Sequence, residues 1–142
     1  MTVTFFGHSY INIPIEKELY GVLENLIVNE NATLFYVGNH GDFDSLVLKT
    51  LTHLYEKYPH IEYYIVFAYI PKYKREHIDY SKTVYPDGLE KVPQKFAIDK
   101  RNRWMIKKSD IVITYVTHTA GGASKYKKIA ENLNKRVMNL FP

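Results

Sequence analysis

Two patterns of apolar residues alternate along the chain. Short runs rich in Val, Ile, Phe and Tyr are typical of buried strands, whereas apolar residues that recur every three or four positions are typical of helices with one buried face. The short runs predict strands over residues 2–6, 33–37, 61–69, 111–116 and 136–140. The longer segments predict helices over residues 16–28, between Asp42 and Pro59, over 94–108, and from Gly121-Gly122 onward.

This alternation predicts an α/β fold, a single Rossmann-like domain over residues 1–142 with a mostly parallel five-stranded sheet and helices on both faces. A chain of 142 residues is long enough to enclose a core of its own. Residues Pro71 to Pro93 show no regular period and contain three prolines. A segment of this length without regular structure is usually functional, so we expect a flap over the site.

Ligands of such sheets bind beyond the carboxyl ends of the strands, where neighbouring loops diverge. Four predicted strands end in polar loops, and the loop after residue 116 leads into Gly121-Gly122 at a helix start. Glycine lets the backbone approach a ligand, and the positive end of a helix favours an anion such as phosphate. The alternative is a plain turn that binds nothing. The predicted ligand-binding residues are Gly7, His8, Ser9, Tyr10, Gly38, Asn39, Asp42, Arg101, Thr117, His118, Thr119, Gly121, Gly122 and Lys125.

Two cations in this set need an anionic partner. Arg101 lies on the same helical line as Ala97 and Met105, so its guanidinium is expected beside an apolar face, where a phosphate or carboxylate would stabilise it. The alternative is an internal salt bridge to Asp99 or Asp110. Lys125 falls in the first turn after the glycines, where a cation opposes the helix dipole and an anion should offset it. The alternative is an exposed lysine that the helix tolerates.

Other polar residues of the loops have more than one interpretation. His8, His40 and His118 each follow a different strand, so a three-histidine zinc site is one possibility. Loop histidines more often bind a ligand through hydrogen bonds or lie at the surface, and we expect no metal and no cofactor. Asp42 and Asp44 either accept ribose hydroxyls or cap the helix that follows them.

Composition and charge narrow the classes of protein. The chain has no Cys, so thiolate metal sites and cysteine nucleophiles are excluded. We expect a cytoplasmic protein without a membrane partner, because no apolar run approaches the roughly 20 residues that span a bilayer and the N-terminus does not resemble a signal peptide. Residues 1–60 carry 3 Lys and Arg against 7 Asp and Glu, and residues 61–142 carry 16 against 8. The basic second half fits an anionic ligand or non-specific nucleic-acid contact.

An ordered set of motifs carries a resemblance to a known superfamily. The segments are TFFGH near the N-terminus, FYVGN at the second strand, RNRWMIKKSD before the fourth strand, and GGASK after it. On these segments the chain resembles the SLOG superfamily, which includes the Lonely-guy phosphoribohydrolases and the DNA-processing protein A group, and it looks closest to small stand-alone members. The resemblance implies a Rossmann-like fold that binds nucleotides or nucleotide-derived signals, often as a homo-oligomer.

The chain departs from the Lonely-guy pattern at the catalytic position. Arg101, Met105, Ser109-Asp110 and the glycine pair match the family motif, but Lys128 stands where those hydrolases have their glutamate. Cleavage of an N-glycosidic bond passes through an oxocarbenium-like centre that a carboxylate stabilises. A lysine cannot do this, although it can bind phosphate. The sequence therefore favours binding without turnover.

Three hypotheses follow. The first is a sensor or sequestering protein for a nucleotide or nucleotide-derived signal, ADP-ribose-like or cyclic, with phosphate on residues 7–9 and 119–125 and the base or ribose near Asn39, Asp42 and a Tyr. Because we see no output domain, sequestration is favoured, and one version is a phage-type sponge of an immune signal. The second is a nucleoside-phosphate N-glycosidase (phosphoribohydrolase) that uses Glu131, Asp42 or Asp44. The third, ranked last because the basic residues are scattered, is a nucleic-acid-binding protein.

Overall fold

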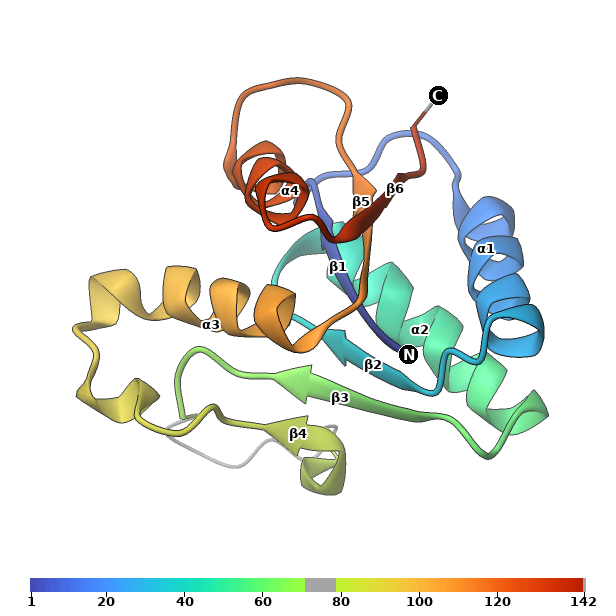
Figure 1. The fold of residues 1–142 in the computed structure, drawn as a ribbon, viewed down its shortest axis with the longest axis horizontal. Helices are drawn as coiled ribbons and strands as arrows, with labels where there is room; N and C mark the ends of the chain where they lie inside the picture. Colours follow the sequence, from blue (N-terminus) through green and yellow to red (C-terminus); the bar gives the residue numbers. More distant parts are fainter. Residues whose placement is uncertain (71–78, 142) are drawn as a thin grey trace.

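The computed structural model describes residues 1–70 and 79–141, and within them the chain forms one six-stranded parallel sheet with four α-helices (Figure 1). The strands are β1 (Thr2–Gly7), β2 (Leu34–Val37), β3 (Glu62–Val66), β4 (Thr83–Val84), β5 (Ile111–Tyr115) and β6 (Arg136–Asn139). The helices are α1 (Glu16–Asn29), α2 (Gly41–Lys57), α3 (Gln94–Lys108) and α4 (Gly122–Asn132), with short 3-10 turns at Tyr80–Lys82 and Leu89–Lys91. The prediction of a Rossmann-like α/β domain is confirmed.

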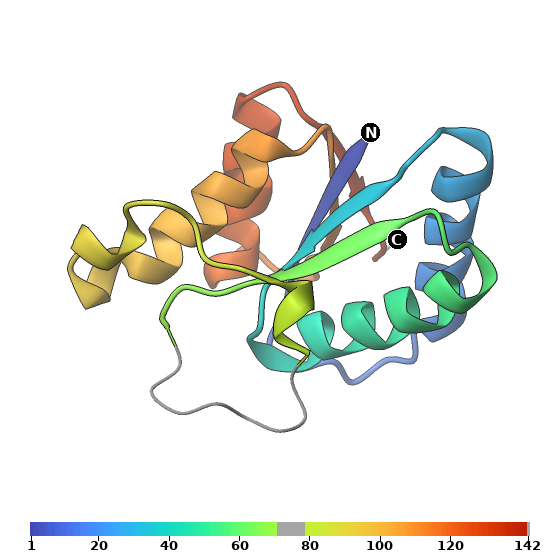
Figure 2. The same ribbon diagram turned by 90° about the horizontal axis from the view of Figure 1, so that it is seen from below.

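The helices cover both faces of the sheet, as Figures 1 and 2 show: α1 and α2 lie on one face, and α3 and α4 lie on the other. Alternation along β1 divides its side chains between two cores, because successive residues of a strand point to opposite faces. Val3 and Phe5 pack with α1 and α2, whereas Phe6 packs with Met105 of α3 and Tyr126 of α4.

The strand count is six rather than the predicted five. β4 has two residues and lies inside the predicted loop of residues 71–93, where it pairs with β3 at Ile65↔Thr83 and Val66↔Val84. A two-residue strand is too short to produce an apolar period, which is why the sequence did not indicate it. β3 is also shorter than predicted and ends at Val66. The proposed flap falls partly on residues 71–78, which lie outside the described residues.

The strand order β4-β3-β2-β1-β5-β6 places the candidate site. The chain moves from β1 outward through β2 to the edge, and it then returns to pair β5 with the other side of β1, from Val3↔Ile111 to Gly7↔Tyr115. The loops that follow β1 and β5 therefore leave the sheet in different directions and open a crevice between them. In the described part of the chain, no helix has the length and apolar character needed to cross a membrane.

Candidate functional site

A cavity of about 410 Å³ lies in this crevice, at the carboxyl end of β1 and against the starts of α2 and α4. This volume falls within the range of small-molecule sites. The lining residues include apolar, polar and basic ones. They are Phe5, Phe6, Gly7, His8, Ser9, His40, Asp44, Ile98, Arg101, Asn102, Met105, His118, Ala120, Gly121, Gly122, Ala123, Lys125 and Tyr126.

Arg101 is the buried cation of the cavity, with 3% of its surface exposed. Its Nε donates to Asn102 Oδ1 at 2.7 Å, and its Nη1 donates to Val66 O at 2.8 Å and to Asn39 Oδ1 at 3.0 Å. Nη2 has no hydrogen-bond partner within residues 1–70 and 79–141. The alternative, a salt bridge to Asp99 or Asp110, is not formed among the described residues: Asp110 accepts from the Thr2 N–H, and Asp99 pairs with Arg103 and Lys125. The guanidinium is thus held by neutral groups, with donor capacity left over.

Asp44 is the acidic group of the cavity, and it approaches Arg101 without forming a hydrogen bond to it. A Cβ on Gly38 would lie 2.7 Å from Asp44 Oδ2 and 3.5 Å from Arg101 Cζ, so the absent side chain of Gly38 leaves room for both groups. Burial raises the pKa of Asp44 to about 6, although the His40 N–H and the Arg101 charge oppose the rise. The cavity therefore holds a carboxyl group that exchanges its proton near neutral pH.

The start of α4 forms another wall of the cavity. Gly121 is its N-cap, with a positive φ of 93°, and no side chain caps the free N–H groups of the first turn. The anion expected beside Lys125 is Asp99 of α3, whose Oδ1 lies 3.3 Å from Lys125 Nζ and also accepts from the Tyr126 hydroxyl at 2.8 Å. Lys125 is therefore partly neutralised, and Arg101 remains the less compensated cation.

Two histidines from adjacent loops stack at the cavity. The rings of His8, after β1, and His118, after β5, lie 4.1 Å apart and within 3° of parallel. The Thr117 N–H donates to His8 Nε2 at 2.8 Å, which fixes that nitrogen as the unprotonated acceptor. Burial, and then the nearby His118, lower the pKa of His8.

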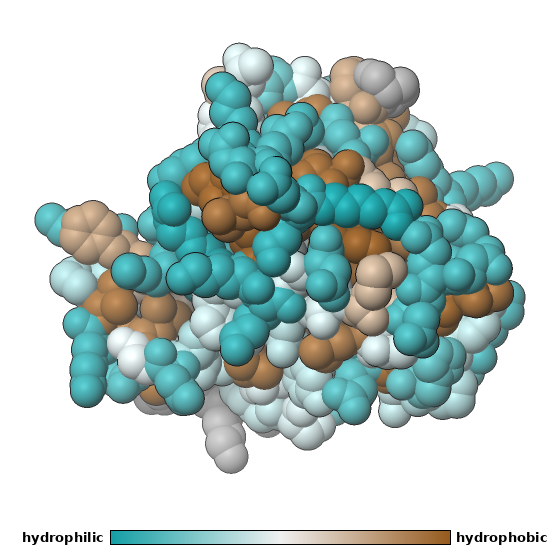
Figure 3. Space-filling view, viewed as in Figure 1, coloured by the Kyte–Doolittle hydropathy of each residue, from teal (hydrophilic) through white to brown (hydrophobic). Residues whose placement is uncertain are grey.

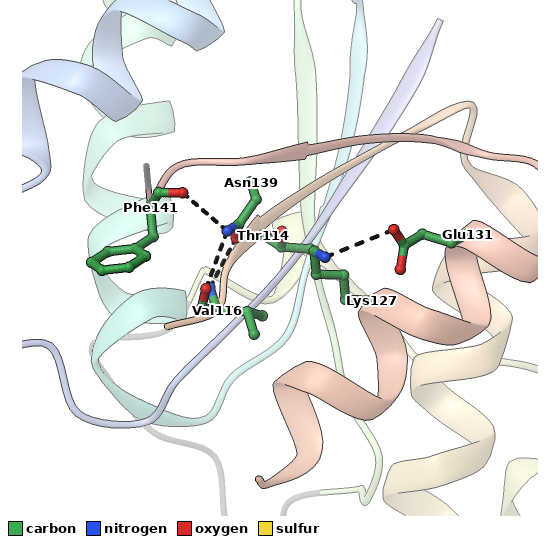
Figure 4. Close-up of polar contacts among 6 residues, drawn as sticks. All are labelled: Thr114, Val116, Lys127, Glu131, Asn139 and Phe141. Atoms are coloured by element: carbon green, nitrogen blue, oxygen red, sulfur yellow. Dashed lines mark hydrogen bonds and ion pairs between the residues drawn. The ribbon is translucent and has the colours of Figure 1, made fainter. Parts of the chain in front are cut away.

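Asn139 of β6 fixes the loop that carries His118 (Figure 4). Its Oδ1 accepts from Thr114 Oγ1 and from the Val116 N–H, both at 2.9 Å. Its Nδ2 donates to the carbonyl oxygens of Val116 at 3.1 Å and Phe141 at 3.2 Å. One side chain thus anchors the end of β5 immediately before the loop reaches the cavity.

The predicted site residues fall into three groups. Those that line the cavity are Gly7, His8, Ser9, Arg101, His118, Gly121, Gly122 and Lys125. Those that support lining residues are Gly38, Asn39 and Thr117. Asp42, Tyr10 and Thr119 do not line it: the Asp42 carboxylate accepts from the Ile11 N–H at 3.1 Å, and Tyr10 is 75% exposed.

The predicted cap of α2, Asp42 or Asp44, is wrong, because the N-cap residue is His40. α2 begins one residue before Asp42, with His40 as its N-cap and without a capping side-chain bond from His40. Gly41 has a φ of 89°, and a Cβ there would lie 2.6 Å from Ser9 Cα, so only glycine fits between the two loops. Asp44 instead accepts from the His40 N–H at 3.0 Å. This hydrogen bond to the residue that precedes α2 holds Asp44 at the cavity.

Sequence reasoning missed several lining residues. Asn102, which follows Arg101 directly and is buried, accepts one of its hydrogen bonds. Tyr126 stacks on Phe6 with their ring centroids 5.3 Å apart. The helical spacing of Tyr126 with Ile129 and Ala130 predicted its apolar face. Nothing in that pattern indicated that its ring would reach a ligand cavity.

Lys128 and Glu131, which were singled out for the hydrolase chemistry, lie away from the cavity. Lys128, at the hydrolase glutamate position, is exposed and does not line it. Glu131 pairs with Lys127 of the same helix at 3.7 Å, and its carboxylate points toward that lysine (Figure 4); it does not line the cavity. His40 lines the cavity with His8 and His118, but the described residues contain no group of three or more metal-ligating side chains suited to a metal ion.

A larger groove of about 690 Å³ lies on the opposite face of α3, bordered by the 3-10 turn at Leu89–Lys91 and by α4. Trp104, Ile129 and Leu133 contribute apolar surface, and Lys100, Arg103 and Lys107 surround it; the face drawn in Figure 3 shows hydrophobic side chains over α4 with hydrophilic ones around them. None of its lining residues lies at a strand end. We therefore take the smaller cavity, at the switch point of the sheet, as the candidate site.

The chain matches no protein-family model, and no curated protein matches it.

Proposed function

We propose that this protein binds a nucleotide or nucleotide-derived signalling molecule without turning it over. The observation that carries the proposal is the buried Arg101, whose Nη2 has no hydrogen-bond partner among residues 1–70 and 79–141, at a cavity whose other wall is the uncapped start of α4. A buried cation beside free backbone N–H groups suits a phosphate, because both supply donors to an anion. The phosphate lies between Arg101 and Gly121-Gly122.

Asp44 fits this arrangement in its protonated form or as an acceptor for ribose hydroxyls. A charged carboxylate beside a bound phosphate would repel it, but a pKa near 6 allows Asp44 to take up a proton when the anion enters. The charge of the cavity can therefore adjust to a phosphate ester. A sensor or sequestering protein in the cytoplasm, acting as a homo-oligomer of SLOG type, is the setting we propose for this site.

The test begins with the protein as purified from cells. Released small molecules are identified by mass spectrometry after denaturation, and calorimetry then measures binding of AMP, ADP-ribose and a cyclic dinucleotide. An intact bound nucleotide, or binding of one of these probes, is expected. A protein that releases nothing and binds none of the probes contradicts the proposal.

A second candidate function is the N-glycosidase, and the position of Asp44 favours it. Of the carboxylates considered from the sequence, Asp44 alone lines the cavity. A carboxyl group that titrates near neutral pH suits a general acid or base in glycosidic cleavage. Incubation with nucleoside monophosphates would then yield free base and ribose 5-phosphate. Asp44→Asn would abolish this release while binding continues; absence of any release in the wild-type protein favours the binding module.

A further inference from the structure

A flat ring surface lies at the cavity, apart from the groups assigned to phosphate. His8 forms its inner, half-buried layer and is held by several contacts. Its backbone N–H donates to Tyr115 O at 3.2 Å, its ring Nε2 accepts from the Thr117 N–H, and its ring meets the Tyr115 ring edge-on at 6.0 Å. Burial, and then the neighbouring His118, lower the pKa of His8, in agreement with its Nε2 acting as an acceptor.

His118 forms the outer layer of this stack. It is exposed, it lines the cavity, and its ring covers His8 on one side. Within residues 1–70 and 79–141 it has no hydrogen bond and no aromatic partner other than His8. The backbone just before His118 is fixed by two hydrogen bonds, from the Val116 N–H to Asn139 and from the Thr117 N–H to His8. The ring of His118 is held in place, exposes one face, and forms no hydrogen bond through either nitrogen among the described residues. Such a ring can accept a planar ligand group.

We propose that the open face of His118, backed by His8, is the platform on which the base of the bound nucleotide stacks. This inference rests on the proposed function and assigns the part of the site that recognises the base. Histidine rings stack on bases, and stacking tolerates any base because each has a π-face. His118 and Gly121 belong to one loop and line one cavity, so base and phosphate are bound by neighbouring parts of the same segment.

The other residues expected near the base are engaged elsewhere. Asn39 accepts from Arg101, and the Asp42 carboxylate accepts from the Ile11 N–H. Tyr10 is 75% exposed and does not line the cavity. The lining aromatic side chain Tyr126 already stacks on Phe6 and donates to Asp99. His118 is an exposed ring that lines the cavity and already stacks on a second ring, so we assign the base to it.

The experiment compares nucleoside monophosphates with ribose 5-phosphate, which lacks the base. Calorimetry at pH 7.5 measures both with the wild-type protein, His118→Ala and His118→Phe. Stacking contributes on the order of tenfold in affinity, so the wild type and His118→Phe should prefer AMP, GMP or UMP to ribose 5-phosphate by about that factor. His118→Ala should lose the preference while its affinity for ribose 5-phosphate is unchanged. Because His118 makes no hydrogen bond among the described residues, both variants should fold.

Proton NMR gives an independent readout. The carbon-bound ring protons of His118, assigned by their loss in His118→Ala, should move upfield when a nucleoside monophosphate binds and should not move with ribose 5-phosphate. A base preference retained in His118→Ala, with no shift of these protons, would overturn the platform and leave the proposed function standing. Failure of all the nucleotides to bind the wild type would overturn both.

Discussion

At the scale of single residues, Asp44 serves ligand binding in the proposed site but lowers the stability of the folded protein. The folded chain raises its pKa to about 6 from an ordinary 3.8, mainly by burial. A raised carboxyl pKa means that the folded state holds the proton more tightly than the unfolded state. Above pH 6 the folded protein therefore carries the cost of a desolvated charge, and this cost disappears as the pH falls from 6 to 3.8.

Asp44→Asn should consequently stabilise the protein at pH 8 by on the order of 1–3 kcal/mol. The amide oxygen still accepts from the His40 N–H, while the buried charge is removed. The gain should shrink towards pH 4, because Asp44 of the folded protein takes up its proton as the pH falls below 6 and no longer carries a buried charge. Urea denaturation at pH 8, 6 and 4 measures it.

Asp42→Asn is the matched control for that change. Asp42 lies in the same first turn of α2 and is exposed, so its substitution removes the same favourable interaction with the helix dipole without relieving a buried charge. Asp42→Asn should show no gain in stability that is larger at pH 8 than at pH 4. Equal stabilisation of both variants at pH 8 would contradict the account of Asp44.

At the scale of elements, the start of α4 decides whether the cavity binds phosphate. A Cβ on Gly122 would find only Tyr126 Cε2, at 4.0 Å, so alanine fits there without strain. Alanine also favours helix over glycine by up to about 1 kcal/mol. Gly122→Ala should therefore leave stability equal or higher, while its methyl group keeps a phosphate from the backbone N–H groups and lowers AMP affinity by about tenfold or more.

Gly21→Ala on α1 controls for the change in helix propensity. Gly21 is an exposed glycine with nothing within 4 Å of its Cβ position, and it does not line the cavity. Calorimetry with AMP should give the wild-type affinity for this variant, and thermal unfolding should show that both variants are folded. If Gly122→Ala binds AMP as tightly as Gly21→Ala does, the phosphate does not contact the start of α4.

The sequence predicted the large elements because each leaves a long apolar signature. β1 and β5 are apolar runs buried in the middle of the sheet, and α3 was predicted with the bounds it has. β4 escaped prediction because two residues that pair only along β3 show no period. The carboxyl-end rule then identified the candidate site, since it requires only the strand ends and their parallel direction.

The chemistry inside the site depended on contacts that no local pattern contains. The pKa of Asp44 is raised by burial and held back by the charge of Arg101, which comes from α3, far along the chain from α2. The stack of His8 on His118 arises because β1 pairs with β5 and brings their two following loops together. Residue type and spacing could identify such groups as candidates, but only the sheet order showed which of them are in contact.

At the scale of the whole molecule, the basic second half of the chain carries less uncompensated positive charge than its composition suggests. Asp99 pairs with both Arg103 and Lys125, and Arg136 pairs with Glu30 from the acidic first half. Two further cations, Lys100 and Lys107, border the groove on the opposite face of α3 from the cavity. Nucleic acid attracted by this charge and a nucleotide in the cavity would therefore occupy different surfaces.

This separation predicts how the molecule responds to salt and to competition. A labelled single strand of about 20 nucleotides that contacts roughly three phosphates should lose about 20-fold in affinity between 50 and 200 mM salt. Lys107→Glu should weaken that binding further and leave AMP affinity unchanged, because Lys107 does not line the cavity. Fluorescence anisotropy follows the strand, and calorimetry follows AMP. An oligonucleotide that displaces AMP, or that binds tightly without dependence on salt, would place a strand in the cavity itself and would favour the nucleic-acid hypothesis over the mononucleotide one.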